Sequence, residues 1–499
     1  MSGNYLLAID QSTQGTKGLL FDETGALTAR VDVPHEQLVD ERGWVEHDPE
    51  ALYNNTLAAA EAVLKKADLP PQRVAGAGIS NQRETAVAWD RKTGEPVYHA
   101  IVWQCARGAE ICERIAAGGH AQLVKNHTGL HLSPYFSAAK LAWILQNVPK
   151  ASELMRRREL CMGTVDSWLL YRLTGGREFK TDYSNASRMQ LFNLTGLCWD
   201  EEVCGLFGID LSALPEVCDS DSLFGYSDFG GLFPNPIPIH AMMGDSHGAL
   251  FGQGGLSPGM MKTTYGTGSS VMMNIGGTPV FSDAGVVTSL AWRVGGKTDY
   301  VLEGNINYTG AVMRWVVQEL GLLSSAKDAC AVAAQANPED ETYLVPAFSG
   351  LNAPYWDSDA KAAICGMTRL TGKAELVKAA EECIAYQIAD IVNIMSRESG
   401  IPIDSLRVDG GPTKDGYLMQ FQSDILQIPI LVPDVEELSG MGAAFAAGLA
   451  MGIYEREPLF SRVRRTQYTP AMPETVRGKK YAGWKAAVNM VLTKNGKRG

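Results

Sequence analysis

The sequence predicts an α/β protein built as two domains, and three observations carry this prediction. The chain has 499 residues, more than one ordinary hydrophobic core accommodates, so two domains of about 250 residues each are expected. Segments typical of strands alternate with segments typical of helices, which favours α/β layering. A hairpin pattern at the N-terminus returns near the middle of the chain, which indicates a duplicated domain.

The first element is predicted to be a β-hairpin. An apolar strand, a turn rich in Ser, Thr and Gly, and a second apolar strand follow one another in residues 5–27. Residues 258–276 repeat this pattern around a second tip of Gly and hydroxyl residues. Because each half then begins with a hairpin, we place the boundary in the Gly- and Pro-rich segment 252–259. The predicted domains are residues 1–253 and 254–499.

The remaining elements of the first half are predicted as alternating strands and helices. Residues 75–90 and 100–103 are typical of strands, and Ala138–Gln146 is typical of a helix. In the second half, apolar residues at intervals of three and four predict one long amphipathic helix over Lys373–Ser399. Gly400 follows it directly and is expected to end it.

Three further elements are expected near the C-terminus. Residues 406–411 are predicted as a strand that runs into a Gly-Gly turn. Helices are predicted over Thr413–Leu426 and Gly440–Tyr454. The Gly and Ala residues of the second helix would allow close approach to a neighbouring element.

Composition excludes several classes of function. Lys and Arg number 44 against 56 Asp and Glu, a net charge of −12, which argues against a nucleic-acid partner because such binding needs a basic face. The nine cysteines form no CxxC pair, so neither a zinc site nor a disulfide framework is indicated. The most apolar tract, residues 441–454, is shorter than the roughly 20 residues of a membrane span. We expect a cytoplasmic protein without a membrane partner.

Three turns rich in Gly and hydroxyl residues are candidates for binding an anion. They are DQSTQGTK (10–17), YGTGSS (265–270) and DGGPTKD (409–415). Glycine lets the backbone approach an anion, and successive N–H groups can point at it. Each turn alone is also typical of an ordinary hairpin or strand–helix connection, and none matches a Walker A loop or a dinucleotide fingerprint. The three together favour a phosphate site.

Two carboxylates follow apolar strands directly. Asp10 would hold Mg²⁺ if it lay at a phosphate site, and otherwise it would cap a turn. Asp245 lies between a glycine and a small-residue helix, where it could cap the helix or act as a general base toward an attacking hydroxyl. The residues alone leave both alternatives open.

Nine sequence blocks, spread nearly from end to end, carry a resemblance to a known family. The blocks are AIDQSTQGTKGLLFD, GISNQRET, SPYFSAAKLAWIL, GTVDSWLLYRLTG, TDYSNASRMQLFNL, YGTGSS, LVPAFSGLNAPYW, LRVDGG and YLMQFQSDIL. In this order they resemble blocks of the FGGY carbohydrate kinases, the glycerol-kinase group of the actin–hexokinase–chaperone superfamily.

The resemblance implies two RNase H-like domains with an interdomain cleft, an ATP-dependent phosphotransferase, and a homodimer or homotetramer. ATP would be held mainly by the second domain and a sugar or polyol mainly by the first. Asp245 would be the catalytic base, and Asp10 and Asp245 would be associated with Mg²⁺. The implied ATP-binding residues are Thr13, Gln14, Lys17, Gly266, Thr267, Gly310, Arg314, Gly411, Pro412 and Asp415. The implied substrate-binding residues are Arg83, Glu84, Trp103, Tyr135, Asp245, Ser246 and Ser270.

Physical chemistry is compatible with the implied acceptor site. A polyol hydroxyl both donates and accepts, so Arg83 and Glu84 could satisfy one together, while Trp103 and Tyr135 could form walls against C–H faces. Without the resemblance, a surface salt bridge and a core tryptophan are the commoner roles for such residues.

Departures from the glycerol-kinase pattern bear on the acceptor. Ser246 stands where these kinases usually carry Gln, Ser270 stands where they usually carry an aromatic residue, and Cys-Ala-Arg follows Gln104 where Asp-Arg-Arg is usual. Truncation enlarges a pocket matched to three carbons, so we expect an acceptor of four to five carbons, a polyol or a ketose. Glycerol is the alternative acceptor. An actin- or chaperone-like ATPase without a sugar substrate is the alternative of a different class.

Overall fold

The structure is a computed structural model that describes residues 4–493, and its secondary structure alternates strands and helices as expected. The strands of the N-terminal half are β1 (Tyr5–Gln11), β2 (Gly15–Phe21), β3 (Leu27–Pro34), β4 (Leu38–Val39), β5 (Val45–His47), β6 (Val74–Asn81), β7 (Val87–Asp90), β8 (Ala100–Ile101), β9 (Leu160–Gly163), β10 (Lys180–Asp182), β11 (Phe192–Asn193), β12 (Cys198–Trp199), β13 (Glu216–Cys218), β14 (Gly225–Ser227) and β15 (Ile237–Gly244). Its helices are α1 (Pro49–Lys66), α2 (Ala109–Ala117), α3 (Ala121–Thr128), α4 (Ser137–Asn147), α5 (Pro149–Arg156), α6 (Val165–Leu173), α7 (Tyr183–Ala186), α8 (Glu201–Phe207) and α9 (Asp245–Gly252).

The C-terminal half contains a second set of strands and helices. Its strands are β16 (Met261–Tyr265), β17 (Ser269–Gly276), β18 (Val287–Val294), β19 (Lys297–Ile306), β20 (Tyr343–Val345), β21 (Ala363–Cys365), β22 (Leu406–Gly410), β23 (Ile430–Pro433) and β24 (Arg465–Tyr468). Its helices are α10 (Gly310–Gln318), α11 (Ala329–Ala333), α12 (Lys373–Ser399), α13 (Gly416–Leu426), α14 (Leu438–Ala450), α15 (Arg456–Ser461) and α16 (Glu474–Val491).

Each half builds a mixed sheet around the hairpin with which it begins. The N-terminal sheet has the order β14-β15-β6-β1-β2-β3, and the C-terminal sheet has the order β18-β19-β17-β16-β22-β23-β24. In both sheets the first strand pairs antiparallel with its hairpin partner and parallel with a later strand. The predicted hairpins at the start of the two halves are therefore confirmed.

The strand directions bring the predicted site residues to one edge of the N-terminal sheet. β6 lies parallel to β1, and β15 lies parallel to β6. Parallel strands have their carboxyl ends at the same edge, which is where open α/β sheets bind ligands. Asp10 near the end of β1, the residues after Asn81, and Asp245 after β15 therefore lie at one edge.

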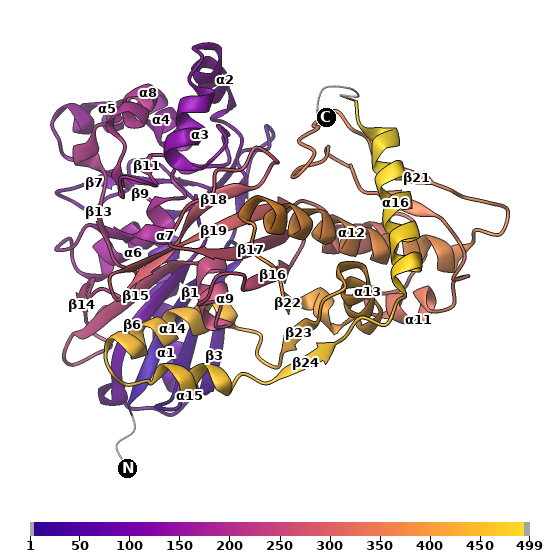
Figure 1. Ribbon diagram of the computed structural model, residues 1–499. Coiled ribbons are helices and arrows are strands. Elements are labelled where there is room, and N and C mark those ends of the chain that lie inside the picture. Colours follow the sequence, from indigo (N-terminus) through magenta and orange to yellow (C-terminus); the bar gives the residue numbers. More distant parts are fainter. Residues whose placement is uncertain (1–3, 494–499) are drawn as a thin grey trace.

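Helix α14 crosses from the C-terminal half to the sheet of the N-terminal half. It packs against β1, β6 and β15 and along α9, and Figure 1 shows this yellow-orange helix beside the indigo strands. The two helices approach through glycines. A Cβ atom on Gly442 would lie 1.9 Å from the carbonyl oxygen of Gly248, and one on Gly252 would lie 2.6 Å from that of Leu438. The division into domains 1–253 and 254–499 stays a prediction.

Two of the four predicted helices agree with the structure, Ala138–Gln146 as part of α4 and Lys373–Ser399, and the other two need correction. The long helix over Lys373–Ser399 is confirmed as α12, ended by Gly400 in the left-handed conformation. The helix predicted over Thr413–Leu426 is wrong at its start, because residues 411–414 form a 3₁₀ turn and α13 begins after Asp415, its N-cap. The helix predicted over Gly440–Tyr454 is α14, which begins two residues earlier and ends at Ala450, just before Gly452 takes a positive φ.

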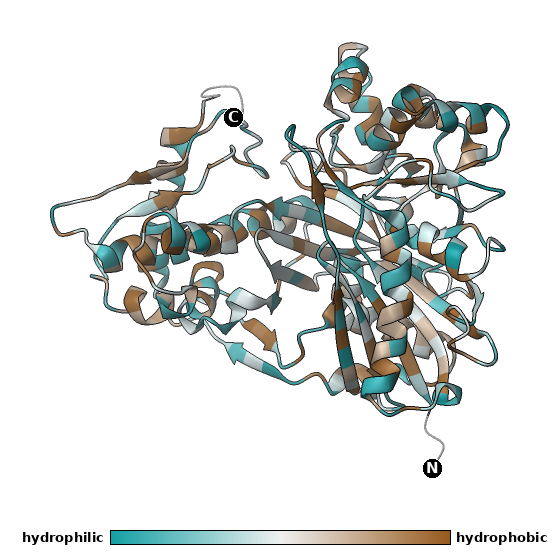
Figure 2. Ribbon diagram, turned by 180° about the vertical axis from the view of Figure 1, so that it is seen from behind, coloured by the Kyte–Doolittle hydropathy of each residue, from teal (hydrophilic) through white to brown (hydrophobic). Residues whose placement is uncertain are grey.

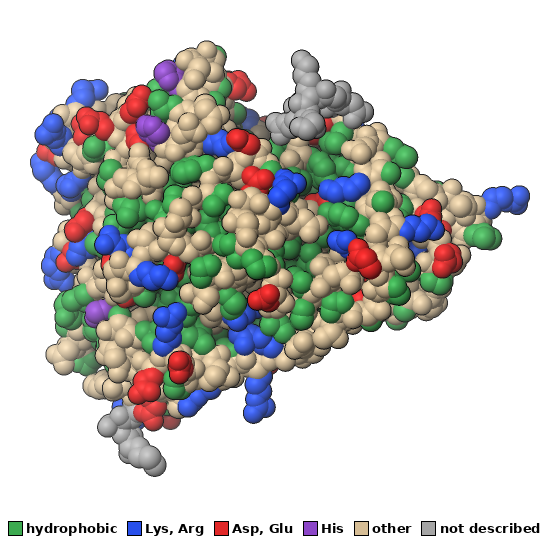
Figure 3. Space-filling model, viewed as in Figure 1, with side chains coloured by type: hydrophobic (Ala, Val, Ile, Leu, Met, Phe, Trp, Pro, Cys, Tyr) green, Lys and Arg blue, Asp and Glu red, His purple; other side chains and the backbone are tan. Residues whose placement is uncertain are grey.

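Hydrophobic residues follow the sheets and the inner faces of the helices. Figure 2 shows brown stretches along the central strands, with teal commonest in the connecting loops. On the face drawn in Figure 3, acidic and basic side chains are interspersed and form no continuous basic patch. Among residues 4–493, no helix is both long and apolar enough to cross a membrane.

Candidate active site

The first hairpin places a buried carboxylate beside a lysine. The register of β1 and β2 sets Asp10 opposite Lys17, whose Nζ lies 3.4 Å from Asp10 Oδ2 and 2.7 Å from Glu437 Oε2. Burial raises the pKa of Asp10, Lys17 lowers it, and the nearby carboxylate of Asp245 raises it again. The other oxygen, Oδ1, is buried and has no hydrogen-bond partner. A cation or polar ligand could bind this oxygen only after it becomes accessible.

Asp245 is the first residue of α9, and Gly244 occupies the N-cap position. Its side chain is 35% exposed, and Oδ1 accepts a hydrogen bond from the backbone N–H of Ser246 at 2.6 Å. Arg83 Nε lies 3.2 Å from the same oxygen. The carboxylate is therefore not the N-cap of the helix, and it is accessible to a substrate.

Arg83 and Glu84 do not bind each other, because each has a buried partner elsewhere. Arg83 donates two hydrogen bonds to Glu303, at 2.8 and 2.9 Å, and Arg188 donates to Glu84 at 2.5 Å. Arg188 also lies 3.0 Å from Glu303. All four side chains are at most 5% exposed. The arrangement is neither a surface salt bridge nor a mutual Arg83–Glu84 pair.

The charges in this cluster stabilise one another. Burial disfavours the charged form of Arg83, but the carboxylates of Glu303 and Glu84 outweigh it and raise the pKa of the guanidinium. Burial likewise opposes ionisation of Glu303, but Arg188 and Arg83 outweigh it and hold its pKa well below the usual range. Glu84 has a φ of +61°, which is uncommon for a non-glycine residue. Its side chain is fixed by the contact with Arg188.

Trp103 and Tyr135 form a half-buried aromatic wall. Their ring centres lie 5.6 Å apart in a T-shaped arrangement, and Trp103 Nε1 donates to Thr13 Oγ1 at 3.0 Å. Burial and the carboxylate of Glu84 raise the pKa of Tyr135, so Tyr135 is close to the charged cluster. The fully buried ammonium of Lys140 donates to the carbonyl oxygens of residues 134–136 and fixes this segment.

The two serines that depart from the glycerol-kinase pattern are partly exposed. Ser246 follows Asp245 in α9, and Ser270 lies on β17. The Ser270 hydroxyl is 3.5 Å from Glu303 Oε1 on the neighbouring strand β19 and can donate to it. Both serines therefore present small polar surfaces near the cluster.

The second and third Gly-rich turns lie side by side at the ends of β16 and β22. Gly310 N donates to the carbonyl oxygen of Gly266 at 2.9 Å, so the start of α10 lies against the hairpin tip. Gly410 has a φ of +99°, and a Cβ atom there would lie only 2.0 Å from Tyr265 O. A Cβ atom on Gly411 would meet nothing within 4 Å. This glycine-lined space could admit a phosphate or a base.

The remaining predicted nucleotide residues lie beside the second hairpin, on α10, around the turn before α13 and at the tip of the first hairpin. Thr267 O accepts from Thr309 N at 3.0 Å, and Arg314 is exposed on α10. Pro412 belongs to the 3₁₀ turn after Gly411, and Asp415 accepts the N–H of Leu418 as the N-cap of α13. The carboxylate of Asp415 therefore already has a structural role. Thr13 and Gln14 form the tip of the first hairpin, and the side chain of Gln14 is exposed.

The carboxylates of Asp10 and Asp245 suit an Mg²⁺ ion that is bound together with ATP. They are too few for a metal ion held by protein side chains alone. Within residues 4–493, no group of three or more His, Cys, Asp and Glu side chains could hold a metal ion. Mg²⁺ usually takes one or two carboxylates and completes its shell with phosphate oxygens and water. The unpartnered Oδ1 of Asp10 and the exposed carboxylate of Asp245 match that requirement.

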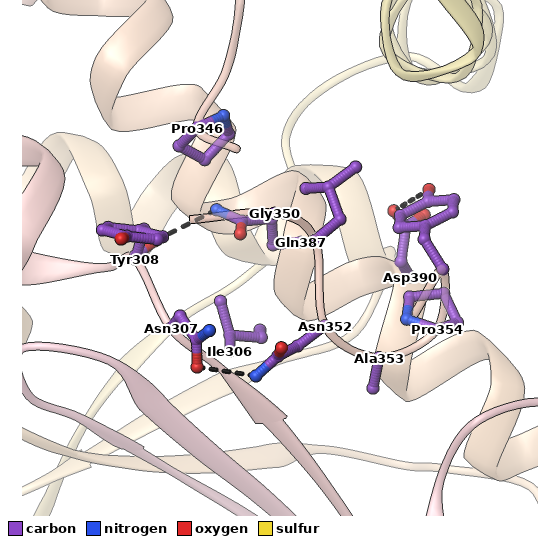
Figure 4. Close-up of a pocket in the computed structure, with 12 residues that line it drawn as sticks. Ile306, Asn307, Tyr308, Pro346, Gly350, Asn352, Ala353, Pro354, Gln387 and Asp390 are labelled. Carbon is purple, nitrogen blue, oxygen red and sulfur yellow. Dashed lines mark hydrogen bonds between the residues drawn. The ribbon is translucent and has the colours of Figure 1, made fainter. Parts of the chain in front are cut away.

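A small pocket flanks the end of β19 and the start of α10. Figure 4 shows Asn307 hydrogen-bonded to Asn352 and Gln387 bonded to the carbonyl of Tyr308 in its lining. Its lining, as far as the described residues define it, includes none of the predicted site residues. Tyr308, which lines the pocket, lies two residues before the predicted nucleotide residue Gly310.

Three charged residues of this region were not predicted from the sequence. They are Arg188, Glu303 and Glu437, and each becomes significant only through partners distant in the chain. Arg188 does lie within the block TDYSNASRMQLFNL, which carries part of the resemblance. No local pattern identifies Glu303, which lies in the buried middle of β19.

Comparison with known proteins supplies a family for this arrangement. The model of the N-terminal domain of the FGGY family of carbohydrate kinases matches residues 5–252, and that of the C-terminal domain matches residues 261–451. Glycerol kinase 1 of Thermotoga maritima is 48% identical over 491 residues, which cover 98% of this chain and 100% of that protein. The glycerol kinase of Symbiobacterium thermophilum is 44% identical over 98% of both chains.

Solved structures match over the full length as well. Plasmodium falciparum glycerol kinase with ADP superposes with a TM-score of 0.93 at 35% identity over 99% of both chains. A xylulose kinase from Lactobacillus acidophilus matches with a TM-score of 0.88 at 21% identity over 99% of both chains, which is a likeness of fold. The two-domain kinase fold expected from the sequence, consistent with an actin-like ATPase, is thereby confirmed.

Proposed function

The chain belongs to the FGGY family of carbohydrate kinases, a phosphotransferase with an alcohol as acceptor, and from this premise we propose that it transfers the γ-phosphate of ATP to a primary hydroxyl of glycerol. The observation that carries the choice of glycerol is the full-length similarity to glycerol kinases at 42–48% identity. The acceptor residues that the family resemblance implies are Arg83, Glu84, Trp103, Tyr135 and Asp245, and we propose that they form the glycerol site.

Asp245 is proposed as the general base. The acceptor hydroxyl would give its proton to the exposed carboxylate as its oxygen attacks the γ-phosphorus of ATP. Arg83 Nε, 3.2 Å from Oδ1, would keep that oxygen oriented, so that Oδ2 faces the acceptor. Trp103 and Tyr135 would hold the C–H faces of the acceptor and exclude water from one side.

The phosphates of ATP would lie among the three turns. Lys17 and the backbone N–H groups near Gly266 and Gly411 can stabilise equatorial charge during transfer, which depends mainly on positioning and electrostatics. Mg²⁺ would be held at Asp10 and Asp245 and would neutralise phosphate charge when bound. Lys17 now binds Glu437 as well as Asp10, and we propose that it exchanges part of this pairing for a phosphate oxygen.

A second candidate is a kinase for an acceptor of four to five carbons. It is favoured by Ser246 and Ser270, two small polar residues where glycerol kinases usually carry larger ones. An additional hydroxyl could bind to the Ser270 hydroxyl, which faces Glu303 at 3.5 Å.

One screen tests both candidates. ADP release is measured with a coupled assay over glycerol, erythritol, pentitols, xylulose and ribulose, and the phosphorylated product is identified by mass spectrometry. We expect glycerol to give the highest kcat/KM. A higher value for a four- or five-carbon acceptor would reject glycerol in favour of the second candidate. ADP release that is independent of every acceptor would reject both and support the ATPase alternative.

A further inference from the structure

We propose that Glu303 is a positioning residue for the acceptor site: it fixes the guanidinium of Arg83 so that only Nε faces the Asp245 carboxylate. The inference rests on the proposed function, since it gives Glu303 a role in how the acceptor and the base are held. Glu303 comes from β19, a strand of the C-terminal sheet, whereas Arg83 and Asp245 come from the N-terminal half.

The geometry of Arg83 leaves little freedom. Its two terminal nitrogens donate to the two oxygens of Glu303 at 2.8 and 2.9 Å, and its Nε lies 3.2 Å from Asp245. A bidentate contact of this kind fixes the plane of a guanidinium as well as its distance. Gly244 makes room for this side chain, because a Cβ atom there would lie 2.6 Å from Arg83 Cγ.

Glu303 also compensates the positive charge of a second arginine, Arg188. Arg188 Nη1 lies 3.0 Å from Glu303, while its Nε donates to Glu84. The fully buried carboxylate of Glu303 therefore binds Arg83 directly and is linked to Glu84 through Arg188. Arg83 and Glu84 are both predicted acceptor residues. A pair of buried guanidinium groups this close requires such a carboxylate between them.

Without the charge of Glu303, the nearest carboxylate for Arg83 is Asp245. The terminal nitrogens of Arg83 would turn toward Asp245 and occupy both of its oxygens, because a buried guanidinium seeks a bidentate carboxylate. The base would then have no free oxygen for the acceptor hydroxyl. Glu303 thus competes with Asp245 for Arg83 and keeps one oxygen of the base available.

The experiment compares Glu303→Gln, Glu303→Asp and a matched control, Glu382→Gln. Glu382 is also a buried glutamate of the C-terminal half, paired with Lys480 at 3.2 Å and Tyr417 at 3.0 Å, and it lies outside the predicted site. Folding is checked by circular dichroism and thermal unfolding. Steady-state kinetics then give kcat and KM for ATP and for whichever acceptor the wild type phosphorylates best.

For Glu303→Gln, we expect kcat/KM for the acceptor to fall about 10–100-fold, the usual effect of misplacing reacting groups by about 1 Å, with KM for ATP unchanged. Glu303→Asp keeps the charge and should recover part of this loss. Glu382→Gln should lower thermal stability without changing the acceptor kinetics. A purely structural role for Glu303 would instead lower activity only in proportion to the folded fraction.

The outcomes separate this inference from the proposed function. A wild type without alcohol-dependent ADP release refutes the proposed function and, with it, this inference. An active wild type whose Glu303→Gln variant folds and keeps its acceptor kcat/KM refutes the inference alone. Equal changes in KM for ATP and for the acceptor would also refute it, because Glu303 contacts no predicted nucleotide residue.

Discussion

Replacing Gly442 with alanine tests the contact between α14 and the helix that begins with Asp245. The added Cβ would lie 1.9 Å from Gly248 O, whereas ordinary contact begins at 3.4 Å, so the two backbones would have to separate by about 1.5 Å. Overpacking of this kind costs about 1–3 kcal/mol, and we expect the upper end because a carbonyl cannot rotate away. Alanine has a better helix propensity than glycine, which offsets about 1 kcal/mol of this cost. We therefore expect the free energy of unfolding to fall by about 2 kcal/mol.

The same separation should displace Asp245. A shift of about 1 Å in a reacting group can cost about 10²-fold in rate, so we expect kcat/KM of Gly442→Ala to fall by one to two orders of magnitude. Stability is measured by urea unfolding, and activity by acceptor-dependent ADP release.

Gly478→Ala is the matched control, because it makes the same change within α16, where a Cβ would meet nothing within 4 Å. It should stabilise the protein by about 0.5–1 kcal/mol and leave activity unchanged. If Gly442→Ala is as stable and as active as Gly478→Ala, the close contact between α9 and α14 is not a constraint and the reasoning is wrong.

Three further variants test other parts of the structure. Asp245→Asn should lower kcat about 10²–10⁴-fold, the usual contribution of a general base, and a near-wild-type rate in the ADP-release assay would remove Asp245 from that role. Ser270→Phe should shift the ratio of kcat/KM values toward glycerol and away from four- and five-carbon acceptors, and an unchanged ratio would count against the argument from pocket size. Burial raises the pKa of Asp166 from 3.8 to about 6, so the folded protein binds a proton that the unfolded chain has lost, and stability falls as pH rises through this window. Asp166→Asn should remove this slope, about 3 kcal/mol in total, in urea unfolding between pH 4 and 7, and an identical slope in both proteins would contradict the assignment.

The parts of the fold that depend on local pattern could be predicted from the sequence. The two hairpins and the helix over Lys373–Ser399 follow from apolar periodicity and from Gly at the turns and helix end. The predicted start of α13 is too early, because Asp415 is the N-cap of this helix. The Gly-Gly-Pro sequence before Asp415 is typical of a turn as well as of a helix start, so it hides the capping role of Asp415. Helix ends depend on single residues, whereas helix existence depends on the whole segment.

The family resemblance named candidate site residues, but it could not give the network of contacts among them. The family resemblance named Arg83, Glu84 and Asp245, yet the side chains that orient them lie 104 and 220 positions away, as Arg188 and Glu303 show. No sequence period connects such positions, because only the tertiary fold brings Glu303 of β19 to Arg83, and Arg188 to Glu84. The acceptor itself was predicted from truncations at two positions, whereas full-length similarity favours glycerol.

The crossing of α14 has a consequence for biosynthesis. Strands β1, β6 and β15 leave the ribosome long before residues 438–450, whose helix completes their apolar cover. At roughly 5–20 residues per second, the stretch of about 190 residues between Gly252 and Leu438 takes about 10–40 s to synthesise. During that interval the nascent N-terminal half exposes the apolar face of its sheet that α14 later covers. A fragment that stops near Gly252 should therefore aggregate. The intact chain should need chaperone protection until residues 438–450 have emerged.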